Sequence, residues 1–177
     1  MSRRFLAATA VLLVLAAGAV AGALLVLRDD DSPPPDVRTG VPVLVSAGEL
    51  AAYADATGTP VYWAGAIEGR RLELTTTRAG TFVRYLPPGA VAGDDDRALT
   101  VATYPLANAF ATATARARNA QMTSEKTQRG GLAVWSRTRP TSVYLAFPDV
   151  RQLIEIYSPD AAEALRLARS GQVVAVG

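Results

Sequence analysis

Hydrophobic residues form one long run near the start of the chain and short, spaced groups after it. The run extends from Phe5 to Leu27 and contains no charged residue. Read as an α-helix that rises about 1.5 Å per residue, it would reach roughly 34 Å, slightly more than the hydrocarbon core of a bilayer at about 30 Å. The pattern therefore predicts a transmembrane helix over residues 5–27.

The charges that flank this run predict its orientation. Arg3 and Arg4 precede it, whereas Arg28 is followed at once by three aspartates. Short cytoplasmic flanks carry the excess of positive charge in single-pass membrane proteins. We therefore expect residues 1–4 in the cytoplasm, a cell-membrane location, and the C-terminal bulk of the chain outside the cytoplasm.

Small residues inside the run support two further hypotheses. Ala17-Gly18-Ala19 and Ala21-Gly22-Ala23 fit the loose pattern at which a secretory signal is cleaved, but the apolar run continues past both to Leu27, which favours an uncleaved anchor. Gly18 and Gly22 also have the G-x-x-x-G spacing that lets two helices approach closely in lipid and form a homodimer. An Ala/Gly-rich helix produces such a pair by chance as well, so self-association stays open.

The next segment has the composition of a stalk. Residues 28–42 combine the three aspartates with Pro33-Pro34-Pro35. Such a segment cannot form a hydrophobic core and favours extended polyproline geometry, with a rise of about 3.1 Å per residue. We expect a stalk over residues 28–42 that carries one extracytoplasmic domain over residues 43–177.

Within the predicted domain, three segments have helical patterns. Ser46 and Glu49 have the spacing of a capping box, and Gly58 is placed to end the helix that follows. Pro105 suits a first helical position, and apolar residues recur after it at helical spacing. The predicted helices cover residues 47–56, residues 105–118, and a third segment that Ser158-Pro159-Asp160 caps and that ends before Gly171.

Short runs rich in β-branched and aromatic residues lie between these helices, and alternation in Leu72-Glu73-Leu74-Thr75 is typical of antiparallel strands with one wetted face. The predicted strands are 61–64, 72–76, 81–86, 99–103, 132–136, 142–147, 152–157 and 173–176, and we expect a polar loop over 119–131. This order predicts an α+β fold, a mostly antiparallel sheet with about three helices. Two tryptophan-bearing meanders, each preceded by a helix, suggest a duplicated α-β-β-β unit.

Composition narrows the chemistry. The chain has no histidine and no cysteine, which removes the usual zinc sites and any Ser-His or Cys-His nucleophile pair. Arg3 and Arg4 account for the formal net charge of +2, so the residues after the run are formally neutral and do not form a basic nucleic-acid surface. We expect no enzyme activity, no cofactor and no nucleic-acid partner.

The candidate chemical groups each have a simpler interpretation. Asp94-Asp95-Asp96 offers oxygen ligands to a cation, but it lacks the alternating carboxylates of a calcium loop and indicates a solvated turn, so we expect no metal site. Glu73 and Glu155 would suit a glycosidase carboxylate pair if their strands were neighbours, but alternation places both on a wet face anyway. Lys126, the only lysine, lacks the S-x-x-K pattern and indicates a loop.

Aromatic and arginine residues in the predicted strands are the best candidates for partner binding, because such residues dominate binding hot spots. The alternative is that they form the core and its rim. The candidate residues are Trp63, Arg84, Tyr85, Trp135, Arg137, Arg139 and Tyr144.

Three strings carry a resemblance to known proteins: Pro60-Val61-Tyr62-Trp63-Ala64-Gly65, the segment from Val83 to Gly89, and the segment from Arg139 to Ala146. They resemble those of small single-pass membrane-anchored proteins of actinobacteria that have no assigned activity, over about residues 45–175. The resemblance implies a cell-envelope location and transfers no site residue.

From these features we expect a membrane-anchored, non-enzymatic extracytoplasmic domain that binds a protein or cell-envelope partner. The alternative is a membrane-tethered domain that senses or carries a small ligand, which would need a concave apolar pocket.

Overall fold

The computed structural model describes residues 32–94 and 97–177, which form an α+β domain with ten strands and three helices. In chain order the elements are β1 (Val43–Val45), α1 (Ala47–Thr57), β2 (Tyr62–Trp63), β3 (Arg71–Thr76), β4 (Thr81–Leu86), β5 (Leu99–Pro105), α2 (Ala109–Ala117), β6 (Met122–Lys126), β7 (Leu132–Ser136), β8 (Ser142–Ala146), β9 (Gln152–Tyr157), α3 (Ala161–Ser170) and β10 (Val174–Ala175).

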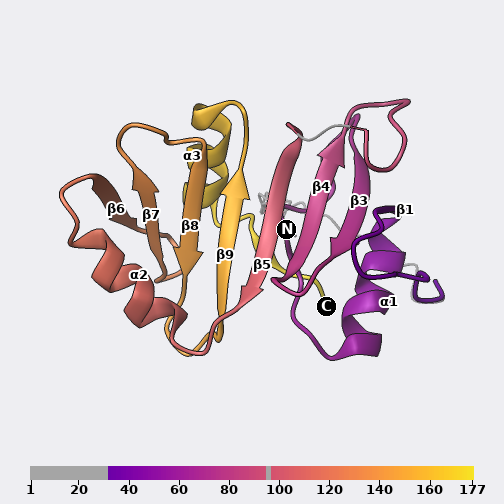
Figure 1. Cartoon of the computed structure of the whole chain (residues 1–177), viewed down its shortest axis with the longest axis horizontal. Helices are drawn as coiled ribbons and strands as arrows, with labels where there is room; N and C mark the ends of the chain where they lie inside the picture. Colours follow the sequence, from indigo (N-terminus) through magenta and orange to yellow (C-terminus); the bar gives the residue numbers. More distant parts are fainter. Residues whose placement is uncertain (1–31, 95–96) are drawn as a thin grey trace, which may run out of the picture.

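Eight strands form one antiparallel sheet in the order β1-β3-β4-β5-β9-β8-β7-β6 (Figure 1). The meanders β3-β4-β5 and β7-β8-β9 join at the centre, where β5 pairs with β9 over six residue pairs, from Thr100 opposite Tyr157 to Pro105 opposite Gln152. A separate two-stranded sheet is made by β2 and β10. The predicted α+β class with a mostly antiparallel sheet is confirmed.

The two halves of the large sheet have the same strand order outward from the β5–β9 junction. In chain order a helix precedes each meander, α1 before β3-β4-β5 and α2 before β7-β8-β9, but α1 packs in the main core and α2 in the smaller cluster on the opposite face. The predicted duplication of an α-β-β-β unit therefore stays a prediction.

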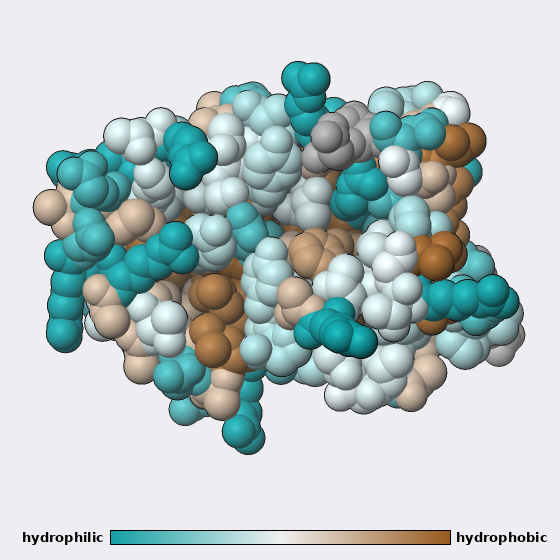
Figure 2. Space-filling model, in the orientation of Figure 1, coloured by the Kyte–Doolittle hydropathy of each residue, from teal (hydrophilic) through white to brown (hydrophobic). Residues whose placement is uncertain are grey.

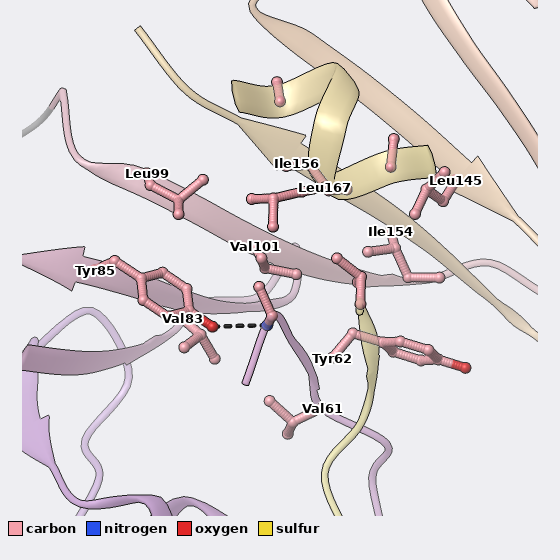
Figure 3. Close-up of a cluster of buried hydrophobic side chains, with 14 of the residues drawn as sticks. Val61, Tyr62, Val83, Tyr85, Leu99, Val101, Leu145, Ile154, Ile156 and Leu167 are labelled. Carbon is pink, nitrogen blue, oxygen red and sulfur yellow. Dashed lines mark hydrogen bonds between the residues drawn. The ribbon is translucent and has the colours of Figure 1, made fainter. Parts of the chain in front are cut away.

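One face of the sheet carries the main hydrophobic core (Figure 3). Residues two apart on a strand point to the same face, so Val83 and Tyr85 of β4 and Val101 of β5 share this face and are fully buried. Leu50 of α1 and Leu167 of α3 pack against them, and the β2–β10 pair covers the middle. This face is covered along its length.

The opposite face is covered by a helix in only one half. A smaller cluster joins Ala109 and Ala113 of α2 to Val134 of β7 and Ala146 of β8. Figure 1 shows α2 in front of this half of the sheet, and α2 has its contacts with β6, β7, β8 and β9. No described helix covers β3, β4 and β5 on this face, and this quadrant is the one of interest for function.

Local signals placed two helices correctly. Ser46 accepts a hydrogen bond from the Glu49 N–H at 3.1 Å while the Glu49 carboxylate accepts from the Ser46 N–H at 2.7 Å, and Gly58 ends α1 with a φ of 60°. Asp160 caps α3 through the Ala162 N–H at 2.9 Å, and Gly171 ends it with a φ of 70°. Helices at these positions were predicted and are confirmed.

The second helix begins four residues later than predicted. Pro105 lies in β5 opposite Gln152, and the Leu106 N–H donates to the Arg151 carbonyl at 2.9 Å, so pairing with β9 continues through the expected helix start. The helix then extends from Ala109 to Ala117. The predicted start at Pro105 was wrong because a proline at a strand end and one at a helix start have the same local signal.

Two strands were not predicted. β6 lies within the expected loop over residues 119–131 and pairs with β7 from Met122 opposite Ser136 to Lys126 opposite Leu132. It is a largely exposed edge strand, so it lacks the hydrophobic alternation that reveals a strand in sequence. β1 has only three residues and pairs with β3. Lys126 is therefore in an edge strand, not in a loop.

The described part of the predicted stalk packs on the domain. Val37 is partly buried against the main core, and the Gly40 N–H donates to the Thr76 carbonyl at 2.7 Å. The predicted transmembrane segment 5–27, with Gly18 and Gly22, lies outside the described residues, as does the cytoplasmic segment 1–4. None of the helices in the described part of the chain is long and apolar enough to cross a membrane.

Candidate functional site

The uncovered quadrant contains a groove that follows the central strand β5. Alternation places Thr100, Ala102 and Tyr104 on this face, and the first two are small. Ala102 lies opposite Phe82 of β4 on one side and Glu155 of β9 on the other, so larger side chains stand on both sides of a low floor. The resulting hollow measures about 190 Å³ and is lined by Phe82, Thr100, Ala102, Tyr104, Glu155 and Tyr157.

Aromatic rings form much of the groove wall. The rings of Phe82 and Tyr104 meet edge to face, with centroids 5.8 Å apart and an interplanar angle of 85°. This is a favourable geometry for two aromatic rings and fixes both side chains. Tyr157, half-buried on β9, forms the opposite wall, and its hydroxyl makes no hydrogen bond within the described structure. The groove thus presents aromatic surfaces on both of its sides.

Glu155 is the acidic group of the groove. Its Oε2 accepts a hydrogen bond from the Tyr104 hydroxyl at 2.8 Å. Burial, followed by this hydrogen bond and the negative charge of Glu155, raises the pKa of Tyr104 well above its ordinary value, so the hydroxyl stays protonated and donates. Among the described residues, no arginine or lysine nitrogen lies within 4.0 Å of the Glu155 carboxylate.

Tyr144 and Arg116 lie next to Glu155, on the half of this face that α2 covers. Tyr144 of β8 lies directly opposite Glu155, and the Arg116 guanidinium of α2 lies 4.5 Å from the Tyr144 ring centroid. Burial and the negative charge of Glu155 raise the pKa of the Tyr144 hydroxyl, and Arg116 opposes that rise. On the side of Glu155 that α2 covers, a cation therefore already lies on an aromatic ring.

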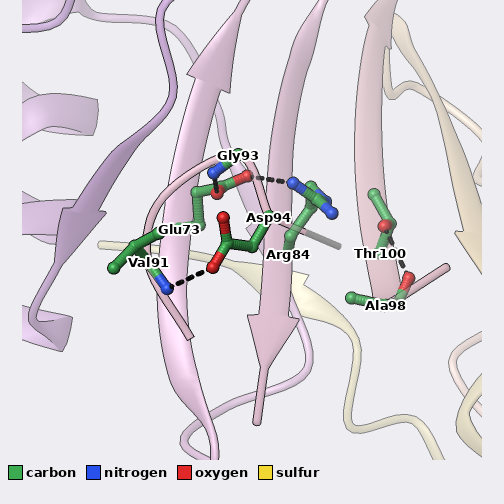
Figure 4. A network of polar contacts seen from close by, with 7 residues as sticks. All are labelled: Glu73, Arg84, Val91, Gly93, Asp94, Ala98 and Thr100. Carbon is green, nitrogen blue, oxygen red and sulfur yellow. Dashed lines mark hydrogen bonds and ion pairs between the residues drawn. The ribbon is translucent and has the colours of Figure 1, made fainter. Parts of the chain in front are cut away.

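A buried ion pair lies beside the groove (Figure 4). Arg84 of β4 donates to Glu73 of β3 at 2.6 Å, and the Gly93 N–H donates to the second Glu73 oxygen at 2.5 Å. Glu73 is fully buried and the Arg84 side chain is 15 % exposed. The loop after β4 thus folds over the end of β3 and β4, where Asp94 accepts from the Val91 N–H at 3.1 Å. The expectation that Glu73 lies on a wet face was wrong.

The two strand carboxylates are far apart. Glu73 lies on β3 and Glu155 on β9, with β4 and β5 between them, which is three interstrand steps or roughly 14 Å. Glycosidase carboxylate pairs lie about 5–9.5 Å apart. Glu73 is also committed to Arg84. These two residues do not form such a pair.

Most of the residues singled out from the sequence do not share one surface. Tyr85 is fully buried in the core, where its hydroxyl accepts from the Ala64 N–H, and Trp135 is 8 % exposed on the same core face with Arg169 6.0 Å from its ring centroid. Trp63 lies in the small β2–β10 sheet. Arg137 and Arg139 are exposed in the turn after β7. Arg84 and Tyr144 lie on the grooved face, separated by β5 and β9.

Sequence reasoning missed most of the groove. It noted Glu155 as a possible acid, but Phe82, Tyr104 and Tyr157 were not selected. A signal was present, because small Thr100 and Ala102 alternate with buried residues on a strand that was predicted. That signal identifies a groove only when the neighbouring strands are known.

No group of three or more acidic side chains in residues 32–94 and 97–177 is close enough to hold a metal ion. Asp95 and Asp96 of the acidic run lie outside the described residues. Three other hollows, of about 450–490 Å³, have no aromatic residue in their linings. The groove along β5 is therefore the best candidate site.

Comparison of the chain with protein-family models, with curated proteins and with solved structures finds no match. The groove along β5 and its side chains are therefore the features from which a function can be inferred.

Proposed function

We propose that this chain is a single-pass, envelope-located membrane protein whose extracytoplasmic α+β domain binds a protein partner through the groove along β5. The single observation that carries the proposal is the quadrant of the sheet that no described helix covers, in which the loop after β4 reaches only the Glu73–Arg84 end and leaves the groove open. Figure 2 shows this face, whose surface is mostly hydrophilic or neutral with separate hydrophobic patches. Such a surface suits a reversible partner better than a permanent hydrophobic dimer interface.

The residue types and the size of the groove support a partner rather than a carried ligand. Tyrosine is enriched in binding hot spots, and ordered rings cost little entropy on binding. Small-ligand sites usually enclose about 300–1,000 Å³ of mostly apolar, aromatic-lined space. The groove is smaller, at about 190 Å³, and the larger hollows lack aromatic residues. The small-ligand sensor or carrier remains the alternative hypothesis.

The proposal assigns no catalytic step. The absence of histidine and cysteine from the sequence and the separation of Glu73 from Glu155 both support a binding role. The predicted anchor would raise the effective concentration of the domain at the membrane, so that a weak site is sufficient.

Site-specific photocrosslinking tests the proposal in membranes of cells that produce the full chain. A photoreactive phenylalanine analogue replaces Tyr157 in the groove, or Tyr53 on α1 as a half-buried aromatic control on the other face. We expect a discrete protein adduct from position 157 and not from position 53. No adduct at 157, or the same adducts from both positions, would contradict partner binding through the groove.

Location is tested separately. We expect the full-length chain to remain with the membranes after alkaline extraction, and a tag after Gly177 to be digested by protease added to intact spheroplasts. A shortened, freely extracted chain or a protected tag would contradict the anchor and its orientation.

A further inference from the structure

We infer that the groove along β5 receives an arginine or lysine side chain of the protein partner, with Glu155 as its counter-charge. This inference rests on the proposed partner-binding function and adds the chemistry of the group that is recognised.

The charge state of the groove is the first argument. Glu155 is partly buried, and no basic nitrogen among the described residues lies within 4.0 Å of its carboxylate. Its hydrogen bond from Tyr104 is neutral, and the nearby Arg116 guanidinium lies over Tyr144 and forms no ion pair with Glu155. A partner that covered the groove with apolar atoms would bury that charge without a directly paired cation, which is unfavourable. An anionic group would be repelled. A cation is the complementary occupant.

The surroundings of the charge are the second argument. Phe82, Tyr104 and Tyr157 provide aromatic surfaces next to the carboxylate, and a guanidinium or ammonium group is attracted to ring faces as well as to the carboxylate. The hollow is small and suits one long side chain rather than a separate ligand. The floor of Thr100 and Ala102 leaves room for the aliphatic part of such a side chain.

The molecule itself supplies the third argument. On the covered side of Glu155, the Arg116 guanidinium of α2 lies 4.5 Å from the ring centroid of Tyr144, which is the cross-strand neighbour of Glu155. Helix α2 thus places an arginine on a tyrosine beside this carboxylate. On the uncovered side, Tyr104 and Tyr157 offer the same kind of surface, and no described helix lies above them. A partner segment would cover Tyr104 and Tyr157 in the same way that α2 covers Tyr144.

The test measures the yield of the photocrosslink from position 157 in membranes that contain the full chain. The yield is compared with and without a second substitution at Glu155. Glu155→Gln keeps an oxygen that accepts from the Tyr104 hydroxyl, removes the charge and replaces the second carboxylate oxygen with an NH2 group of similar size. We expect it to reduce the adduct at least about fivefold, because a desolvated cation loses its counter-charge. Glu155→Asp, which retains the charge, should restore part of the yield. The thermal unfolding midpoint of each variant checks that the fold is intact.

A competition experiment identifies the chemistry directly. N-acetylarginine amide is added before irradiation, and N-acetylcitrulline amide, which is similar in shape and neutral, is the matched control. We expect the arginine compound to suppress the adduct and the citrulline compound to have little effect, and we expect an arginine or lysine near the crosslinked position of the partner.

The outcomes separate the two proposals. If the adduct forms and Glu155→Gln leaves its yield unchanged, or if arginine and citrulline compete equally, the basic-side-chain inference is overturned while partner binding stands. Adducts only between copies of this chain also overturn the inference. A neutral sugar polymer in place of a protein overturns both the inference and the proposed protein partner. If no adduct forms from position 157 in the unaltered background, the proposed function itself fails.

Discussion

Replacing Tyr85 by phenylalanine tests the account of the core. The Tyr85 side chain is fully buried, and its hydroxyl accepts from the Ala64 N–H at 2.7 Å and donates to the Gly65 carbonyl at 3.2 Å (Figure 3 shows the first bond). These bonds connect β4 of the large sheet to the segment after β2. Burial raises the pKa of this hydroxyl far above its ordinary value, so it is neutral and can both donate and accept.

Tyr85→Phe retains the ring and its packing but leaves the buried Ala64 N–H without its acceptor. A buried polar group that loses its partner costs about 1–3 kcal/mol. We expect a loss of about 2 kcal/mol in the free energy of unfolding. At about 2–4 °C per kcal/mol for a chain of this size, the midpoint of thermal unfolding should fall by roughly 4–8 °C.

The assay is denaturant and thermal unfolding of the full chain in detergent micelles, followed by near-ultraviolet circular dichroism. Tyr157→Phe is the matched control, because the Tyr157 hydroxyl makes no hydrogen bond within the described structure, and it should change stability by less than about 0.5 kcal/mol. A loss below about 0.5 kcal/mol for Tyr85→Phe, or equal losses in both variants, would refute the reasoning that Tyr85 holds the small sheet to the large one.

Three further predictions concern stability. Glu73→Gln leaves the largely buried Arg84 without its counter-charge and should cost roughly 3 kcal/mol in urea unfolding; a loss under about 1 kcal/mol would show that the pair is not desolvated. Gly80→Ala would place a Cβ 2.2 Å from the Thr103 carbonyl oxygen, so the β3–β4 turn must shift and the unfolding midpoint should fall, whereas an unchanged midpoint would contradict this close approach. Burial raises the folded-state pKa of several tyrosines above the unfolded value near 10, so the unfolded state loses these protons first as the pH rises. The free energy of unfolding should therefore be constant from about pH 8 to 9.5 and decrease above about pH 10. Urea unfolding at a series of pH values measures it, and an increase above about pH 10 would contradict this prediction.

Local signals were sufficient for elements whose ends depend on nearby residues. The capping box of Ser46 and Glu49 and the cap at Asp160 are made within one helical turn, so the sequence predicts them directly. Strands with buried alternation, such as 81–86, were predicted for the same reason. The edge strand β6 has one neighbour and a polar sequence, so its pairing with β7 decides its conformation.

The candidate site required more than the sequence. The sequence indicated Glu155 as a candidate because it is a carboxylate between hydrophobic residues. Its neighbours Tyr104 and Phe82, however, come from strands that are distant in the chain. Tyr85 and Trp135 have the residue types of a binding surface, yet the pleat turns both into the core. A shift of one residue in register would exchange these roles.

The amino-acid sequence by itself determined the antiparallel α+β character of the described domain, the ends of α1 and α3, and the absence of histidine and cysteine chemistry, because each depends on residue type and on spacing within a few residues. Only the tertiary structure decided that β5 pairs with β9, that α2 covers only one half of its face of the sheet, and that Glu155 lies among aromatic rings beside that half without an ion-pair partner among the described residues. These features depend on contacts between residues that are far apart in the chain, and the hydrophobic pattern along a strand specifies which face is buried but not which strand lies beside it.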